Sequence, residues 1–156
     1  MIRAAAAFLI AGTPGLYLTP ILRQAAIRFG IVDRSDGKLK NRRDPVPYLG
    51  GLAIYLAFLL SLAFPVTFER EVLGILLSGA IVVILGLIDD LGVLSPSVKL
   101  AGQAVAVATL LKSSVSIQLT FVPSGPALAL SFLWLLAVTN AFNLIDIMDG
   151  LSAGTP

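Results

Sequence analysis

The chain has 156 residues, of which 57% are hydrophobic and only 13% are charged, and its mean hydropathy is +0.94. An ordinary globular domain carries roughly 25% charged residues, so this composition excludes a typical soluble fold and predicts a membrane protein. The net charge of +2 is small, and no nucleic-acid partner is expected. Cysteine and histidine are both absent, which leaves Asp, Asn, Lys, Arg and a bound metal for catalysis.

Five apolar segments follow one another along the chain and are predicted to be membrane-spanning helices: residues 2–22, 48–66, 72–88, 98–111 and 127–143. A crossing helix needs roughly 20 residues, and the fourth segment is the shortest. The first is expected to be interrupted by glycines and prolines (Gly12, Pro14, Gly15, Pro20) and to be retained rather than cleaved as a signal peptide.

Residues 115–121 alternate apolar and polar side chains, which predicts a short strand at the external membrane interface. The predicted fold class is therefore an all-α membrane protein, a polytopic helical bundle with about five transmembrane helices and a short external β-strand segment. We expect residues 1–156 to form a single integral membrane domain. Contacts with membrane lipids follow from this fold class.

The basic residues are unevenly distributed. Seven of the eleven Lys and Arg residues fall within residues 23–47. Cytoplasmic loops carry an excess of Lys and Arg, so this segment is predicted to be cytoplasmic. Strict alternation of five spans then places residues 89–97 and the chain beyond residue 143 on the same side.

One pair of acidic residues, Asp89 and Asp90, closes the apolar run 82–88. A carboxylate at a bilayer centre costs roughly 2.5–3.5 kcal/mol on insertion scales and less near the interface, so such a residue suggests a functional site. The negative end of the helix dipole also disfavours carboxylates there, and a divalent cation would reverse that effect. The alternative is a polar helix stop before Gly92.

A second polar cluster repeats every three residues: Asn140, Asn143, Asp146 and Asp149. Four oxygen-bearing side chains thereby gather on one side of a helix end. Amides and carboxylates together can hold a metal and bind a sugar, ribose or uracil edge. The alternative is an Asn-rich helix end capped by Gly150.

A third element, Asp44-Pro-Val-Pro47-Tyr-Leu-Gly50-Gly51, follows the basic segment. Paired glycines let a helix start approach a neighbouring helix or a phosphate closely. The basic residues before it are predicted either to attract an anionic substrate or to be topology signals alone.

These motifs in this order resemble the polyprenyl-phosphate N-acetylhexosamine-1-phosphate transferases: Pro45-Val-Pro47-Tyr-Leu-Gly50-Gly51, then Leu87-Ile-Asp89-Asp90-Leu-Gly with Lys99-Leu and Gln103, then Asn140-Ala-Phe-Asn143-Leu-Ile-Asp146 through Asp149-Gly150. The resemblance implies a bacterial multi-pass cytoplasmic-membrane enzyme with its active site on the cytoplasmic face. It implies transfer of a sugar 1-phosphate from a UDP-sugar to undecaprenyl phosphate, with UMP released and Mg²⁺, or alternatively Mn²⁺, required. The motifs look more like those of the GlcNAc-type enzymes that initiate lipopolysaccharide or teichoic acid synthesis. The phospho-MurNAc-pentapeptide transferase of peptidoglycan synthesis is the alternative.

The resemblance also implies roles for individual residues. Asp89 and Asp90 would be catalytic and would contribute to the metal site. Asn140, Asn143, Asp146 and Asp149 would bind the UDP-sugar, the last two also holding metal. Lys40, Arg42 and Arg43 would attract the anionic substrates, Lys99 would offset local acid charge, and a homodimer is an option.

The chain departs from the family pattern in two motifs and in length. Where the family often has Lys-x-His, this chain reads Lys40-Asn41-Arg42, with Arg in place of His, and Ile147 replaces a glycine beside Asp146. The family has roughly ten or eleven spans and further catalytic residues after the second acidic motif, so we expect this chain to be an N-terminal half that is inactive alone. Two alternatives of other classes are a cation-coupled transporter, whose polar residues would lie near the membrane midplane, and an inactive membrane segment.

Overall fold

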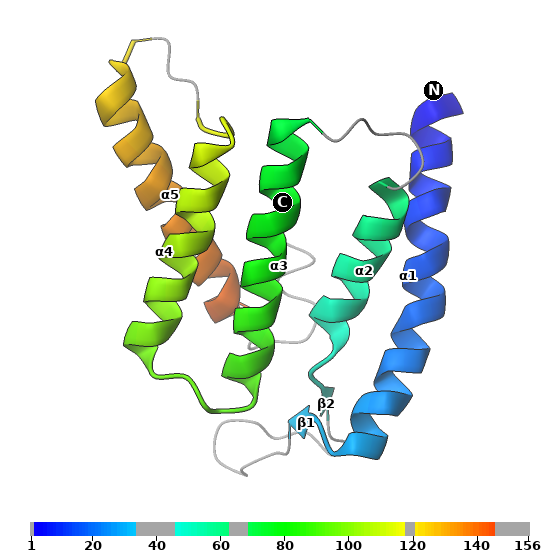
Figure 1. Cartoon of the computed structure of the whole chain (residues 1–156). Helices are drawn as coiled ribbons and strands as arrows, with labels where there is room; N and C mark the ends of the chain where they lie inside the picture. Colours follow the sequence, from blue (N-terminus) through cyan, green and yellow to red (C-terminus); the bar gives the residue numbers. More distant parts are fainter. Residues whose placement is uncertain (1, 34–45, 63–68, 118–120, 146–156) are drawn as a thin grey trace. The chain divides into compact units, whose positions relative to one another are not determined.

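The computed structural model describes residues 2–33, 46–62, 69–117 and 121–145. Within these ranges the chain forms helices α1 (Ile2–Phe29), α2 (Gly50–Leu62), α3 (Arg70–Asp90), α4 (Pro96–Lys112) and α5 (Ser124–Ile145), and strands β1 (Val32–Asp33) and β2 (Val46–Pro47) (Figure 1). Each of the five segments predicted as a helix is therefore represented by a helix, and the mainly α-helical class is confirmed.

Contacts between residues divide the chain into two compact units. The first consists of Met1–Thr67 and Val83–Ser95, and the second of Phe68–Val82 and Pro96–Pro156. The first unit therefore holds α1, α2, the strands and the last part of α3. The second holds the first part of α3 together with α4 and α5.

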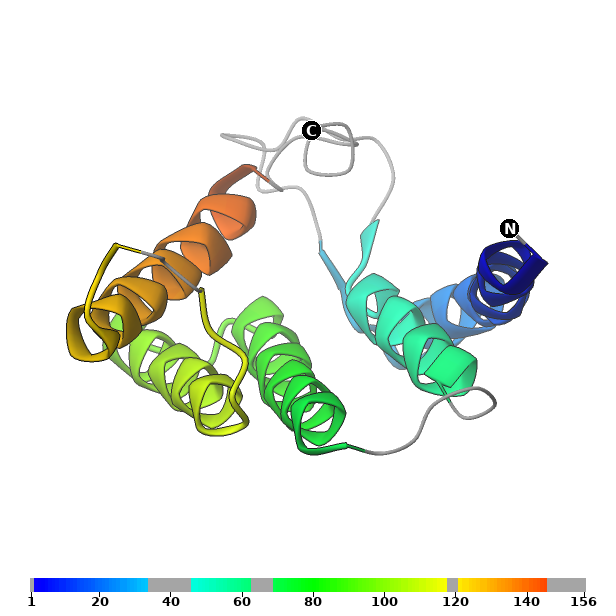
Figure 2. The same cartoon turned by 90° about the horizontal axis from the view of Figure 1, so that it is seen from above.

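In the first unit α1 and α2 pack side by side (Figures 1 and 2). The residues buried in this unit are small: Ala26, Ala53 and Ala57 are 0%, 1% and 6% exposed. A Cβ built on Gly15 would lie 3.7 Å from the Cβ of Ala57. Small side chains allow two helix backbones to approach closely, which is the usual way that membrane helices gain packing energy.

The predicted interruption of the first helix is absent, because α1 runs without a break through Pro14 and Pro20 and continues to Phe29. The threonine before each proline bonds a backbone carbonyl one turn earlier: Thr13 Oγ1 donates to Leu9 O at 2.7 Å, and Thr19 Oγ1 to Gly15 O at 2.6 Å. These bonds do not replace those that the prolines remove, because the carbonyls one turn before Pro14 and Pro20 are those of Ile10 and Leu16. Proline is nevertheless tolerated in membrane helices, where surrounding groups and local backbone adjustments compensate for the missing bond.

A short antiparallel ladder connects the end of α1 to the start of α2. Gly30, at φ +72°, ends α1, and Ile31 N donates to Ala26 O at 2.8 Å. Val32 then pairs with Pro47 and Asp33 with Val46. The ladder was not predicted, and it brings together the two ends of segment 34–45, which itself lies outside the described residues.

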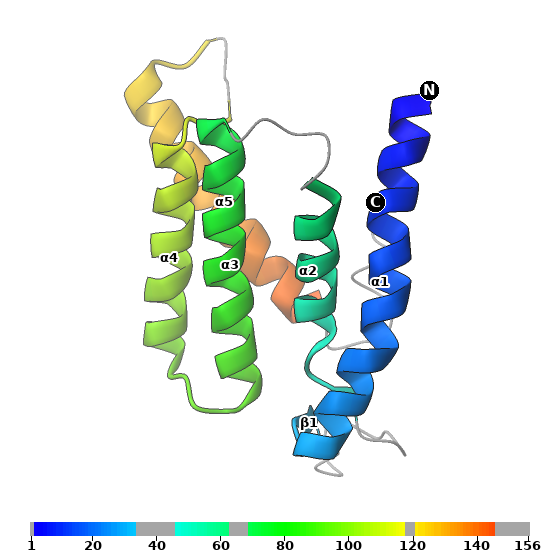
Figure 3. The same cartoon turned by 45° about the vertical axis from the view of Figure 1, so that its right-hand side comes forward.

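In the second unit α5 runs obliquely against α4 (Figure 3). The buried face of α4 is formed by Gln103, Ala106 and Val107, which recur at helical spacing. On α5, Ser131 is fully buried and accepts a hydrogen bond from Ile117 N at 3.1 Å. Arg70, at the start of α3, donates to Lys112 O at 2.6 Å.

The predicted strand at 115–121 is not confirmed. Residues 115–117 and 121 are in no strand, and 118–120 lie outside the described residues. The Ile117 backbone amide instead bonds the Ser131 hydroxyl. Period-two alternation over a few residues is a weak signal on its own, because a strand also needs a partner that bonds its backbone.

Among the described residues two helices are long and apolar enough to cross a membrane, Arg70–Asp90 and Ser124–Asn143, and α2 is a shorter apolar helix. Only 11% of each long segment is buried within the protein, in contrast to the core helix of a soluble domain. These two helices indicate a membrane protein. Five spans and a single domain stay predictions.

Candidate functional site

Asp89 and Asp90 form the last turn of α3, in the first unit. The helix ends here because Gly92 adopts φ +72°, and its amide donates to Asp89 O at 2.8 Å. This is a helix end of the left-handed glycine type, so the predicted helix stop before Gly92 is present. Asp89 is partly exposed and Asp90 is exposed, and both carboxylates are therefore accessible to water and to a ligand.

The two predicted asparagines lie on α5 in the second unit, and both are bonded to α4. Lys99 Nζ donates to Asn143 Oδ1 at 2.9 Å, and Asn140 Nδ2 donates to Gln103 Oε1 at 2.9 Å. Since the earlier residue of α4 meets the later residue of α5, the two helices run in opposite directions here. Residues three or four apart share a helix face, so the two bonds are successive contacts between the same two faces.

These four residues differ in exposure. Gln103 is only 5% exposed, Asn140 and Lys99 are partly exposed, and Asn143 is exposed. The polar contact therefore extends from a buried amide to an accessible one. Such a gradient is suited to a binding site whose inner residues hold its outer residues in place.

Five predicted site residues lie outside the described residues: Lys40, Arg42, Arg43, Asp146 and Asp149. The part of the chain that the structure describes contains no group of three or more acidic, His or Cys side chains arranged to hold a metal ion. The Mg²⁺ site predicted from Asp89, Asp90, Asp146 and Asp149 therefore stays a prediction.

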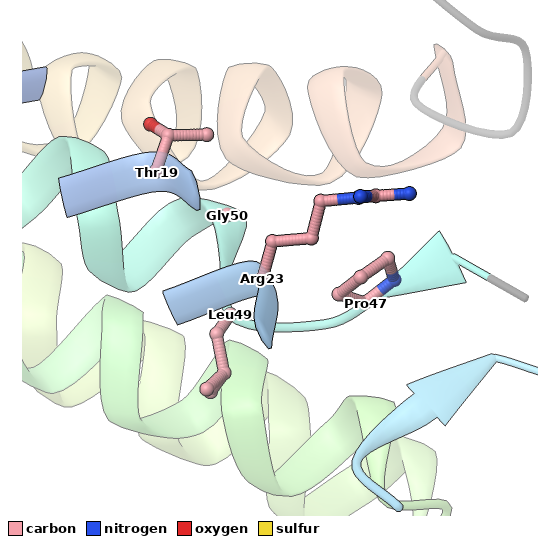
Figure 4. A pocket seen from close by; sticks show the side chains of 5 residues that line it. All are labelled: Thr19, Arg23, Pro47, Leu49 and Gly50. Carbon is pink, nitrogen blue, oxygen red and sulfur yellow. The ribbon is translucent and has the colours of Figure 1, made fainter. Parts of the chain in front are cut away.

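The Pro-Val-Pro-Tyr-Leu-Gly-Gly motif contributes to a cavity of about 140 Å³ in the first unit, lined by Thr19, Arg23, Pro47, Leu49 and Gly50. Figure 4 shows the Arg23 side chain extending past Pro47. An arginine beside a small, largely apolar cavity can bind an anion. Sequence reasoning counted Arg23 only as a topology signal, because nothing in the sequence indicates that α1 extends far enough to bring it beside this motif.

Carboxylate, amide and basic side chains at the ends of apolar helices can bind the charged head of an amphipathic ligand. Carboxylates suit a hard divalent cation, amides suit hydroxyl and carbonyl groups, and Lys or Arg suits phosphate. Together these observations define the chain as a membrane protein with polar binding groups concentrated near helix ends.

Residues 72–156, more than half of the chain, match glycosyl transferase family 4, and the chain belongs to that family. It is 32% identical to a protein of Bacillus subtilis named "Probable undecaprenyl-phosphate N-acetylglucosaminyl 1-phosphate transferase", over 99% of this chain and 45% of that protein. It is 33% identical to the undecaprenyl-phosphate alpha-N-acetylglucosaminyl 1-phosphate transferase of Thermotoga maritima, over 88% of this chain and 44% of that protein.

The chain is also 34% identical to the phospho-N-acetylmuramoyl-pentapeptide-transferase of Halalkalibacterium halodurans, over 87% of this chain and 49% of that protein. The chain thus spans about half the length of the curated relatives that it matches. No solved structure gives a significant match. The family assignment made from the motifs is confirmed.

Proposed function

We propose that the full-length protein transfers GlcNAc-1-phosphate from UDP-GlcNAc to undecaprenyl phosphate, or to a related polyprenyl phosphate, and releases UMP. The observation that carries this proposal is the pair of asparagines at the end of a membrane-length apolar helix, bonded to α4 within the region that matches the family. An active site at a helix end suits one substrate that arrives from water and another that arrives within the bilayer. The names of the relatives in Bacillus and Thermotoga support GlcNAc as the sugar.

The proposed reaction is an in-line phosphoryl transfer. An oxygen of the lipid phosphate forms a bond to the phosphorus that carries the sugar, and the bond from that phosphorus to the bridging oxygen of the diphosphate breaks. The bridging oxygen leaves with UMP. Positioning and charge neutralisation supply most of the catalysis in such a transfer.

Asp89 and Asp90 fit a divalent metal, because two accessible carboxylates stand together where the α3 dipole is negative. When bound, Mg²⁺ or Mn²⁺ would neutralise the charge of the diphosphate. One of the two carboxylates would hold the metal together with Asp146 and Asp149, and the other would orient the lipid phosphate.

Cationic and amide side chains would bind the substrates in this proposal. Asn140 and Asn143 would contact the UDP-sugar. Basic residues before α2 would draw the anionic substrates to the site: Arg23, Lys40, Arg42 and Arg43. The cavity beside Arg23 supports this role for Arg23.

A multi-pass protein of the bacterial cytoplasmic membrane, with its active site facing the cytoplasm, fits this function. The concentration of Lys and Arg in residues 23–47 supports that orientation. Single cysteines replacing Ser35 and Ser124 in the full-length protein should be labelled from opposite sides of the membrane. Labelling of both from the outside would contradict the orientation.

Purified full-length protein, supplied with undecaprenyl phosphate and Mg²⁺, should release UMP from UDP-GlcNAc. The same assay with UDP-MurNAc-pentapeptide tests the second candidate, which is favoured by the similarity to the Halalkalibacterium enzyme. Release of UMP from UDP-MurNAc-pentapeptide alone would move the protein to peptidoglycan synthesis. Release from neither donor would favour a transporter, although Asp89 and Asp90 stand at the end of a 21-residue helix rather than near its middle.

A further inference from the structure

The contact between α4 and α5 contains a residue with no role so far. Gln103 is 5% exposed and lies beside Ala106 and Val107 on the buried face of α4. A buried amide costs free energy unless it is hydrogen-bonded, and an apolar side chain would pack here without that requirement. Gln103 meets it through the bond to Asn140.

The orientation of the Asn140 amide follows from its two bonds taken together. Asn140 Nδ2 donates to Leu136 O and to Gln103 Oε1, both at 2.9 Å. A backbone carbonyl can only accept, so the group that faces Leu136 must be the NH₂, and the atom of Gln103 that faces it must be an oxygen. An NH₂ group has two hydrogens, and both are used. Asn140 therefore has its oxygen, an acceptor, to offer to a ligand.

The amide of Asn143 has the opposite orientation, with its oxygen bonded and its NH₂ group available to a ligand. The Lys99 ammonium can only donate, so it must face the oxygen of Asn143, at 2.9 Å. Asn143 is exposed, and its NH₂ group carries two donor hydrogens. Asn140 and Asn143 lie three residues apart on one face of α5, which places an acceptor and a donor beside each other.

We infer that Gln103 is a positioning residue for the UDP-sugar: it holds Asn140 so that the acceptor of Asn140 and the donor of Asn143 together bind a hydroxyl or imide group of that substrate. The inference rests on the proposed function. Without Gln103 the Asn140 amide keeps only its bond to Leu136 O, and the second hydrogen of its NH₂ group loses its partner. The Asn140 side chain is then held less firmly, and its acceptor is no longer kept at one place beside Asn143. The lipid phosphate has no group that requires such an acceptor, so its binding should not depend on Gln103.

The test compares Gln103→Met with Val107→Ala in the full-length protein. The first removes the acceptor that holds Asn140, at similar side-chain length. The second disturbs the same buried face of α4 without touching either asparagine. For each variant we would measure the melting temperature in detergent and the KM for UDP-GlcNAc and for undecaprenyl phosphate.

Gln103→Met should raise the KM for UDP-GlcNAc about tenfold, the equivalent of one lost hydrogen bond, and leave the KM for undecaprenyl phosphate unchanged. Val107→Ala should lower the melting temperature and leave both KM values unchanged. A purely structural role is shown instead if Gln103→Met lowers the melting temperature and leaves the KM for UDP-GlcNAc at the wild-type value. Wild-type protein that releases no UMP would contradict the proposed function itself, which distinguishes the two failures.

The exchange variant, Gln103→Asn with Asn140→Gln, covers the case in which Gln103→Met does not fold. It can restore an amide–amide bond between the helices but displaces the acceptor on α5 by one methylene group. The inference expects a melting temperature near that of the wild type and a raised KM for UDP-GlcNAc. Recovery of both values to the wild-type level would overturn the inference.

Discussion

The two helix pairs of this protein are held together in different ways. α1 and α2 approach each other at Gly15 and Ala57, and the other buried helix residues of this pair, Ala26 and Ala53, are equally small and apolar. α4 and α5 meet through side-chain hydrogen bonds that include a buried glutamine and a lysine. Small residues suffice to pack two membrane helices. The polar contact between α4 and α5 thus differs from the packing of the first pair, and this difference motivates the positioning role inferred for Gln103.

Energetics support the same distinction. Hydrogen bonds between membrane helices contribute only about 0.6 kcal/mol on average, whereas a buried amide without its partner costs roughly 1–3 kcal/mol. A polar contact of this kind thus adds little stability and makes the pair sensitive to the loss of either partner. Its specific effect is to fix where amide donors and acceptors point.

The largest expected effect concerns the end of α3. In the full-length protein, Asp89→Asn and Asp90→Asn should each reduce kcat by roughly 10²–10³-fold, because each removes a charge that the proposed reaction uses directly. Both variants keep the size of the side chain, and the bond from the Gly92 amide is accepted by the backbone oxygen of Asp89, which the substitutions leave in place. UMP release under saturating substrates measures the effect.

Membrane insertion and melting temperature serve as controls for these two variants and should be close to those of the wild type. If both variants retain near-normal turnover, the acidic pair is a helix stop and nothing more. The proposed site would then depend on α4, α5 and the basic residues before α2.

A smaller effect is expected at Asn143. Asn143→Ala removes both the acceptor for Lys99 and a proposed donor to the UDP-sugar, and hydrogen bonds to charged groups contribute about 1.5–3 kcal/mol. The value of kcat/KM for UDP-GlcNAc should therefore fall roughly 10–100-fold. Thr139→Val is the matched control on the same helix, because the Thr139 hydroxyl donates within α5, to Leu135 O at 2.8 Å. An equal loss in both variants would indicate a general disturbance of α5.

The positions of the helices were predictable from the sequence because long apolar runs bounded by charged or turn residues are a strong signal. The end of α3 is the clearest case, since Asp89 and Asp90 are followed by Gly92. The continuity of α1 through Pro14 and Pro20 was missed, because proline and glycine mark breaks in soluble helices but are tolerated in membrane helices. Its extension to Phe29 was missed because the apolar run ends at Leu22. The β1–β2 ladder was missed because two-residue strands have no periodicity.

The site was predictable only in part. The three-residue spacing of Asn140 and Asn143 indicated a shared face of a helix, and the structure confirms it for these two residues. Their partners on α4 could not be derived from spacing, because contacts between helices depend on how the helices cross. Gln103 was part of the motif that carries the family resemblance, but its bond to Asn140 follows only from the tertiary packing, as does the position of Arg23 beside the cavity.

The smallest expected effect is a difference in stability between alanine substitutions at Gly15 in the first unit and Gly74 in the second. A Cβ at Gly74 in α3 would overlap the Ser113 side chain, whereas a Cβ at Gly15 would make an ordinary contact with Ala57 at 3.7 Å. Overpacking costs typically 1–3 kcal/mol, and alanine recovers about 1 kcal/mol of that through its higher helix propensity. Gly74→Ala should therefore lower the stability of the full-length protein by up to about 2 kcal/mol, and Gly15→Ala should leave it unchanged or slightly raised.

Unfolding in detergent, followed by circular dichroism, measures both variants. Adding Ser113→Gly to Gly74→Ala should recover stability, because it removes the Ser113 Cβ and Oγ atoms that the new methyl group would meet. This recovery identifies the overlap as the cause rather than a general effect on α3. Equal stability of Gly74→Ala and Gly15→Ala would mean that the start of α3 does not approach Ser113 closely, and that the second unit packs at this point as loosely as a lipid-exposed surface.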